Sequence, residues 1–116
     1  MRARALHRWR VSYDEALAIQ RRLRAELRVE PLATTAVRLI AGADVAYSRR
    51  THRMYASVVV CSLPELGIVE RRHAARRARF PYIPGLFSFR EVPPLLAAFA
   101  QLRSTPDLLL FDGQGF

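Results

Sequence analysis

Three stretches that are expected to be strands follow one another in the middle of the chain, two of them apolar and the third rich in arginine, and this succession most constrains the fold that the sequence can adopt. They cover residues 36–47, 54–63 and 68–79, with short polar turns between them. In the first stretch Ala41, Ala43 and Val45 recur at every second position, the period of a strand with one buried face. The second stretch is β-branched and almost continuously apolar, which is typical of a strand covered on both faces. The three stretches therefore predict an antiparallel meander.

A helix is predicted before the meander. Ser12 and Glu15 stand at the spacing of a capping box, in which a hydroxyl and a carboxylate each accept a hydrogen bond from a backbone N–H group. Apolar residues from Ala16 to Leu27 recur at near-helical spacing, and Pro31 is expected to end the helix.

A second helix and a short strand are predicted after the meander. Residues 95–102 have a helical apolar pattern. Pro93 and Pro94 are expected near the first turn of this helix, because a proline in a helix interior costs about 3 kcal/mol. Residues 108–111 form an apolar run that predicts a buried strand. A meander followed by a helical crossover to another strand indicates an α/β fold.

The charge of the chain limits its partners. The chain has 116 residues, enough for one domain, and 19 basic residues, all arginine, against 10 acidic ones give a net charge of +9. This excess favours a polyanion such as nucleic acid, although genomic base composition also accounts for abundant arginine. Arg76 and Arg77 lie in a basic run and are candidate phosphate contacts. The alternative is a strand edge that charge protects from aggregation. Trp9 is predicted to be a packing anchor.

Other classes of protein are disfavoured by the composition. Cys61 is the single cysteine, so the chain has no internal disulfide or cysteine-based metal cluster, which fits a reducing compartment. No apolar run approaches the roughly 20 residues that cross a bilayer. We therefore expect a cytoplasmic protein with no membrane association.

Three acidic residues are candidates for a metal site. Asp44 lies in a strand among small or apolar neighbours, Glu91 lies at a helix entry, and Asp112 ends an apolar strand. Carboxylates that converge at such positions would bind Mg²⁺, a cation that prefers oxygen ligands. Two alternatives stay open: Asp112 can simply begin an Asp-Gly turn, and Glu91 can form a capping box with Ser88. A lone carboxylate in an apolar strand is costly without a partner or a metal, which makes Asp44 the strongest candidate.

Three sequence blocks together resemble the endonuclease V family. They are A-G-A-D-V-A-Y at residues 41–47, F-P-Y-I-P-G-L-F-S-F-R-E at 80–91 and F-D-G-Q-G at 111–115. The resemblance implies an α/β, ribonuclease H-like mixed sheet with flanking helices. It also implies a metal-dependent endonuclease of DNA repair, which cleaves the second phosphodiester bond 3′ to deoxyinosine. Some members of the family act on inosine in RNA, so an inosine-specific endoribonuclease is an alternative.

The resemblance also assigns roles to individual residues. Asp44, Glu91 and Asp112 match the family's catalytic metal ligands for Mg²⁺ or Mn²⁺. The strand-separating wedge is matched by Pro81, Tyr82, Ile83 and Pro84, and the base pocket by Gly85, Phe87 and Gly113. Arg90 is a candidate phosphate contact.

The chain departs from the family after the third block. Family members continue with a basic, histidine-containing stretch and further strands and helices, whereas this chain stops at Phe116. We therefore expect residues 1–116 to form a single, incomplete endonuclease V-like domain that contains only its N-terminal part. The alternatives are a catalytically inactive nucleic-acid-binding remnant and a split half that requires a complementary C-terminal chain. We also expect the isolated chain to be poorly soluble or self-associating.

Overall fold

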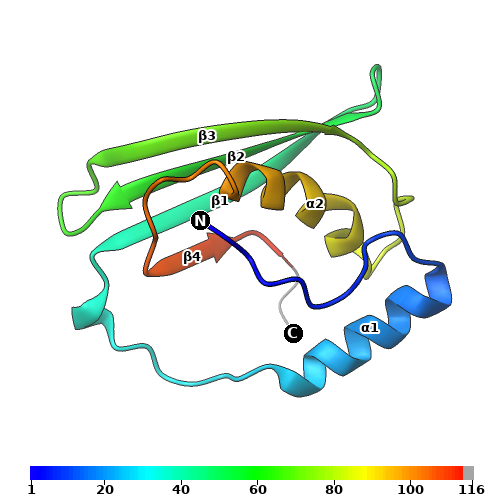
Figure 1. Cartoon of the computed structure of the whole chain (residues 1–116), viewed down its shortest axis with the longest axis horizontal. Helices are drawn as coiled ribbons and strands as arrows, with labels where there is room; N and C mark the ends of the chain where they lie inside the picture. Colours follow the sequence, from blue (N-terminus) through cyan, green and yellow to red (C-terminus); the bar gives the residue numbers. More distant parts are fainter. Residues whose placement is uncertain (114–116) are drawn as a thin grey trace.

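A four-stranded sheet organises the molecule in the computed structural model, which describes residues 1–113 (Figure 1). The strands are β1 (Leu39–Ser48), β2 (Arg53–Ser62), β3 (Ile68–Arg77) and β4 (Leu108–Phe111). Their order in the sheet is β3-β2-β1-β4. The first three strands pair antiparallel, and β4 pairs with β1 in parallel. The predicted meander, helical crossover and α/β class are therefore confirmed, with strand ends that differ from the prediction by up to three residues.

The first helix, α1 (Tyr13–Glu26), begins as predicted and ends early. The Ser12 hydroxyl accepts from the Glu15 backbone N–H, and the Glu15 carboxylate accepts from the Ser12 N–H, each at 3.2 Å. The predicted continuation to Pro31 is wrong, because Leu27 already has an extended backbone. A residue that precedes proline disfavours the helical conformation, and the chain leaves the helix before reaching it. A short 3₁₀ helix, η1 (Thr34–Ala36), lies before β1.

The second helix, α2 (Phe87–Phe99), begins eight residues earlier than predicted. Pro93 and Pro94 lie inside it rather than near its first turn, and Ser88 is an interior residue, so the capping box with Glu91 is not formed. The two prolines remove two helix hydrogen bonds. Packing offsets this cost, because Leu95, Ala98 and Phe99 on the following turns are buried.

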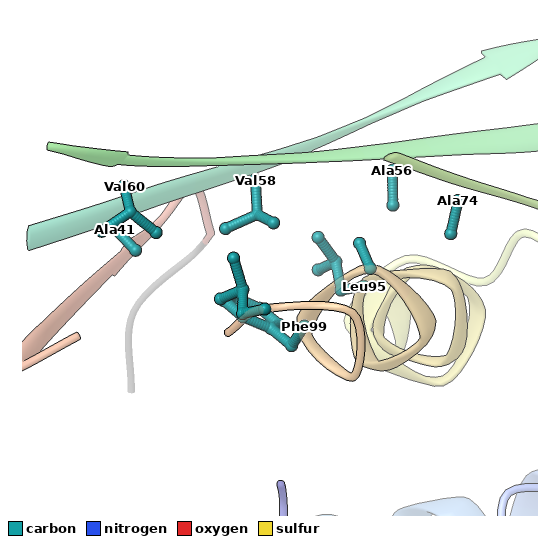
Figure 2. Close-up of a cluster of buried hydrophobic side chains, with 9 residues drawn as sticks. Ala41, Ala56, Val58, Val60, Ala74, Leu95 and Phe99 are labelled. Atoms are coloured by element: carbon teal, nitrogen blue, oxygen red, sulfur yellow. The ribbon is translucent and has the colours of Figure 1, made fainter. Parts of the chain in front are cut away.

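The main core lies between α2 and one face of the sheet. In Figure 2 the side chains of Val58 and Val60 point from the sheet toward Leu95 and Phe99 of the helix. The sheet also contributes small side chains at three positions, namely Ala41, Ala56 and Ala74. Small residues let the helix approach the sheet closely, so α2 holds a fixed position relative to the strand ends.

A second hydrophobic cluster joins α1 to the segment that precedes α2 and to the first turn of α2. It contains Ala16 of α1 with Phe80, Leu86 and Phe89, and Trp9 packs against it. This agrees with the predicted packing role of Trp9. The cluster fixes residues 80–89 from the side opposite the sheet, so this segment is held by two elements.

The prediction that β2 is covered on both faces is wrong for the face opposite α2. Met54, Ala56, Val58 and Val60 of this strand are buried, whereas the alternate residue Tyr55 is 45% exposed. Within residues 1–113, β2 is therefore covered on one face rather than on both. No helix in this part of the chain is long and apolar enough to span a membrane.

Candidate functional site

The parallel pairing of β1 and β4 places two of the predicted acids beside each other in the register. The last paired residues are Ala43 and Phe111, and Asp44 and Asp112 come directly after them on neighbouring strands. The carboxyl ends of parallel strands are where open α/β sheets bind ligands. Glu91 lies on the second turn of α2, which packs over the same sheet.

A cleft of about 1120 Å³, which we call the acidic cleft, lies at this end of the molecule. Glu91 and Asp112 both line it. Its walls also contain Arg90, one residue of the predicted wedge and all three of the predicted base pocket: Tyr82, Gly85, Phe87 and Gly113. The structure therefore brings two acids, one wedge residue and the three pocket residues into one cavity, although they come from two separate parts of the sequence.

The electrostatics of the acidic cleft are expressed in the pKa of one of its acids. The pKa of Glu91 is raised, first by burial and then by the negative charges of Asp44 and Asp112. Arg90 acts in the opposite direction as the weakest of these influences. The carboxyl groups of Asp44 and Asp112 are thus near enough to Glu91 to disfavour its ionised form.

The donor chemistry of these residues fits a hard divalent cation. All three side chains offer carboxylate oxygens, and their mutual repulsion is the condition that a bound cation relieves. Within residues 1–113, however, no three acidic, histidine or cysteine side chains are close enough together to form a ready-made metal site. The oxygen ligands are present, and their convergence on one ion requires a rearrangement of side chains.

Asp44 is the one of the three acids that does not line the acidic cleft. Its side chain is exposed and accepts a hydrogen bond from the backbone N–H of Val45 at 2.8 Å. It lines a separate hollow of about 540 Å³ that Ser57 and His73 also line, from the neighbouring strands. The expectation that burial in an apolar strand makes Asp44 costly is wrong, because alternation along β1 directs it away from the core.

The loop of residues 81–84 borders the acidic cleft and is held at its end. Gly85 has a φ of 86°, a conformation that residues with a Cβ rarely adopt. The Gln20 side chain of α1 donates a hydrogen bond to the Gly85 carbonyl at 2.7 Å. Tyr82 is 66% exposed, with its ring 5.1 Å from that of Phe87. Ile83 packs against the second hydrophobic cluster, so it anchors the loop.

Arg90 is held by aromatic rings. Its guanidinium carbon lies 4.3 Å from the ring centroid of Tyr47 and 5.9 Å from that of Tyr82. Such stacking is a cation–π contact, and it leaves the N–H groups of the guanidinium directed around the rim of the planar group. Arg90 therefore links the end of β1 to the exposed tyrosine of the loop.

The two other candidate phosphate contacts lie elsewhere. Arg76 and Arg77 do not line the acidic cleft; they line a second cleft of about 760 Å³. Arg10 and Arg79 line this second cleft too, and Arg90 lines both clefts. We call the second cavity the arginine cleft. It lies on the other side of the loop, where Pro81 forms part of its wall.

Several residues of these clefts escaped the sequence analysis. Gln20 lines the acidic cleft from α1, and Arg10 lines the arginine cleft from the N-terminal segment. No sequence signal marks Gln20 or Arg10, since tertiary packing alone brings them there. Tyr47 is different, because it belongs to the first of the three sequence blocks and could have been named from it.

Comparison with known proteins identifies relatives over nearly the whole chain. The family model described as Endonuclease V matches residues 21–116. An endonuclease V of Dehalococcoides mccartyi is 44% identical over 99% of this chain and 51% of its own length. The crystal structure of the Bacillus subtilis enzyme superposes with a TM-score of 0.89 at 26% identity, covering 99% of this chain and 50% of that one.

A third relative is bound to nucleic acid. The endonuclease V of Ciona intestinalis, in complex with a DNA that contains an inosine followed by a ribo-adenosine, superposes with a TM-score of 0.80 at 27% identity. The match covers 89% of this chain and 46% of that one. The ribonuclease H-like fold is thereby confirmed. The chain spans about half the length of the relatives that it matches.

Proposed function

This chain belongs to the endonuclease V family, and from that premise we propose that it is a metal-dependent endonuclease that acts on inosine-containing nucleic acid in the acidic cleft. One observation carries the proposal: Glu91 and Asp112 share a cavity with the exposed Tyr82 of the loop, and Asp44 within β1 is the next residue after the last pair that β1 forms with β4, as Asp112 is on β4. The same cavity therefore offers oxygen ligands for a cation and an aromatic surface for a base.

The three acids have a common role in this proposal. Asp44, Glu91 and Asp112 hold Mg²⁺ or Mn²⁺ once their side chains converge. A bound cation would supply an activated water and stabilise the charge that develops on the scissile phosphate. Without it, the carboxylates would repel the phosphate. The pKa of Glu91 is raised first by burial and then by the charges of Asp44 and Asp112, both of which a cation would counteract.

The loop supplies recognition. The Tyr82 ring is exposed and can take the place of a stacking partner when a base leaves the duplex. Pro81, Ile83 and Pro84 keep the ring in place, two through their fixed backbone angles and one through its packing. Extrusion costs a few kcal/mol and is easiest for a weakly paired base such as hypoxanthine. The extruded base enters the pocket formed by Gly85, Phe87 and Gly113.

The proposed substrate is deoxyinosine in DNA, cut at the second phosphodiester bond on its 3′ side, as a step of DNA repair. The nucleic acid held by the Ciona relative contains an inosine, which supports an inosine substrate. Its ribo-adenosine favours a second candidate, cleavage of RNA beside inosine. A cytoplasmic location stays a prediction.

The main alternative is a chain that binds nucleic acid without cutting it. Because the match extends over about half of each relative, a complementary C-terminal chain would then complete the single domain that residues 1–116 begin. This alternative predicts binding without a nick by the chain alone, and a nick after the complementary half is added.

The test is a mapped cleavage assay. The purified chain is incubated with an end-labelled duplex that holds one deoxyinosine, and with the same duplex holding deoxyguanosine, in Mg²⁺, Mn²⁺ or a chelator. Asp112→Asn is compared with Asp14→Asn, a matched change in the first turn of α1. We expect a nick only beside deoxyinosine, only with metal, and only when Asp112 is intact. A nick in the chelator, or an equal nick by Asp112→Asn, would contradict the proposal.

A further inference from the structure

The arginine cleft differs from an ordinary charged surface in its composition. Five arginines line it, namely Arg10, Arg76, Arg77, Arg79 and Arg90, and none of its lining residues is acidic. The ion pairs in residues 1–113 are Arg8 with Glu15 and Arg72 with Glu70, so none of the five arginines is neutralised by a partner in this part of the chain. Unpaired positive charge inside a concavity attracts an anion.

The positions of these arginines in the chain argue against the alternative that they only protect a strand edge from aggregation. β3 is an edge strand, and Arg76 and Arg77 at its end serve that purpose by themselves. Arg10, however, comes from the N-terminal segment, Arg79 from the connection to the loop and Arg90 from α2. Side chains from three separate parts of the chain, residue 10, residues 76–79 and residue 90, converge on one cavity, an arrangement that edge protection does not require.

The cleft also has an aromatic and apolar floor. Trp9, Phe80 and Phe89 line it beneath the arginines, and their rings contact one another, with the Trp9 and Phe89 centroids 5.8 Å apart. Phe80 and Phe89 are 8% and 5% exposed, so these rings pack the wall of the cleft rather than offer their faces to bases. The guanidinium groups are therefore what the cleft presents to a ligand, and they suit phosphates.

The position of the cleft decides which nucleic-acid strand occupies it. The loop of residues 81–84 separates the two cavities: Pro81 lines the arginine cleft, and Tyr82 lines the acidic cleft. We propose that the arginine cleft binds the phosphate backbone of the complementary strand of a duplex, while the strand that contains the lesion lies in the acidic cleft. The inference rests on the proposed function and adds a second, non-catalytic strand site to it.

The test compares two variants of equal charge. One carries Arg76→Gln, Arg77→Gln and Arg79→Gln in the cleft, and the control carries Arg21→Gln, Arg24→Gln and Arg28→Gln, which do not line it. Binding is measured by fluorescence anisotropy over a range of salt concentrations, for an inosine-containing duplex and for its lesion strand alone. A chelator is present, so the readout does not depend on cleavage and a failed nick leaves it intact.

We expect the cleft variant to lose about 2–3 units of the salt dependence of duplex binding, at about 0.9 unit for each lost phosphate contact. The control variant is expected to lose less than about 1 unit, and the two variants should bind the single strand alike. An equal loss in both variants would overturn the proposal. So would an equal loss on duplex and single strand, which would place the lesion strand in the cleft.

A second readout needs no variant. Trp9 is the only tryptophan of the chain and lines the arginine cleft. Addition of the duplex to the unmodified chain is expected to change the Trp9 emission, whereas the single strand at the same bound fraction leaves it nearly unchanged. An emission that stays constant when the duplex saturates the protein would also overturn the proposal.

Discussion

The acidic cleft and the arginine cleft share one loop and one helix but differ in their balance of charge. Two acids, Glu91 and Asp112, and two arginines, Arg49 and Arg90, line the first, whereas five arginines and no acid line the second. A cluster of carboxylates repels the phosphate that it must cut, so in our account it contributes little to affinity without a cation. The placement of the positive charge therefore matters more than the net charge of +9, because four of the five arginines of the arginine cleft line no cavity that also contains an acid.

Residues of both clefts adjoin the second hydrophobic cluster, so loss of a side chain from this cluster should have the largest effect on binding and cleavage. Phe89 is 5% exposed, packs 5.4 Å from the Phe80 ring and directly precedes Arg90 and Glu91. We expect Phe89→Ala to destabilise the fold by about 3–5 kcal/mol and to remove both binding and cleavage. Urea unfolding measures the first effect.

The matched control for this change is Val29→Ala, since Val29 is 71% exposed. It should alter stability by less than about 0.5 kcal/mol. A similarly small loss for Phe89→Ala would mean that the clefts do not depend on the second hydrophobic cluster.

The loop between the clefts should give an intermediate effect. Removal of the Tyr82 ring deprives the displaced base of its stacking surface, which is worth about 1–3 kcal/mol, or roughly 5- to 150-fold in the rate of nicking a deoxyinosine duplex. Tyr82→Phe retains the ring and should act nearly as the unmodified chain does. The two variants are compared at equal protein concentration on the duplex and on the single strand.

This comparison also distinguishes the wedge from a packing role. The loss for Tyr82→Ala should shrink on a single strand, which has no partner to hold apart. If Tyr82→Phe and Tyr82→Ala are equally impaired, the hydroxyl rather than the ring is what the loop contributes.

Glu70 lies outside both clefts and should affect stability alone. Its side chain is 8% exposed and accepts hydrogen bonds from the Ser104 hydroxyl at 2.6 Å and from the backbone N–H groups of Arg103 and Ser104. These bonds, with a smaller contribution from Arg72, lower the pKa of Glu70 from 4.5 to about 2. The pKa is depressed in the folded state, so the stabilisation is full above pH 4.5 and is lost as the pH falls toward 2.

We therefore expect Glu70→Gln to melt at a lower temperature at pH 7 and to lose less of its stability than the unmodified chain between pH 5 and pH 2. Thermal melts across this range provide the measurement. Parallel acid profiles for the two proteins would show that these hydrogen bonds do not favour the ionised carboxylate.

The sequence predicted the elements whose signals are local. The meander follows from alternation and β-branching, and the capping box at Ser12 follows from two side chains three residues apart. The start of α2 could not be predicted in this way. Pro93 and Pro94 indicate a helix start, whereas burial of Leu95 and Phe99 against the sheet lets the helix tolerate both prolines.

Only those parts of the candidate site that have a local sequence signal were predicted. Glu91 and Asp112 belong to recognisable sequence blocks and do share a cleft. The charge run around Arg76 gave no indication that it would meet Arg10 from the far end of the chain. Asp44 was assigned to an apolar environment from its neighbours, but the side-chain alternation of a strand exposes it. Which side chains meet is set by tertiary packing, and local spacing carries little of that information.

The central claim is that the acidic cleft cuts the strand and contributes little to affinity without a cation. The most direct test measures the bound fraction of one labelled deoxyinosine duplex in a chelator and its nicked fraction with Mg²⁺. Three proteins are compared: the unmodified chain, Glu91→Gln and the exposed control Glu26→Gln. The account predicts that Glu91→Gln binds the duplex as the other two do and nicks it at least about 100-fold more slowly, since each 1.4 kcal/mol of lost transition-state stabilisation is about tenfold in rate. Equal nicking by Glu91→Gln, or a loss of binding in proportion to the loss of nicking, would contradict the account.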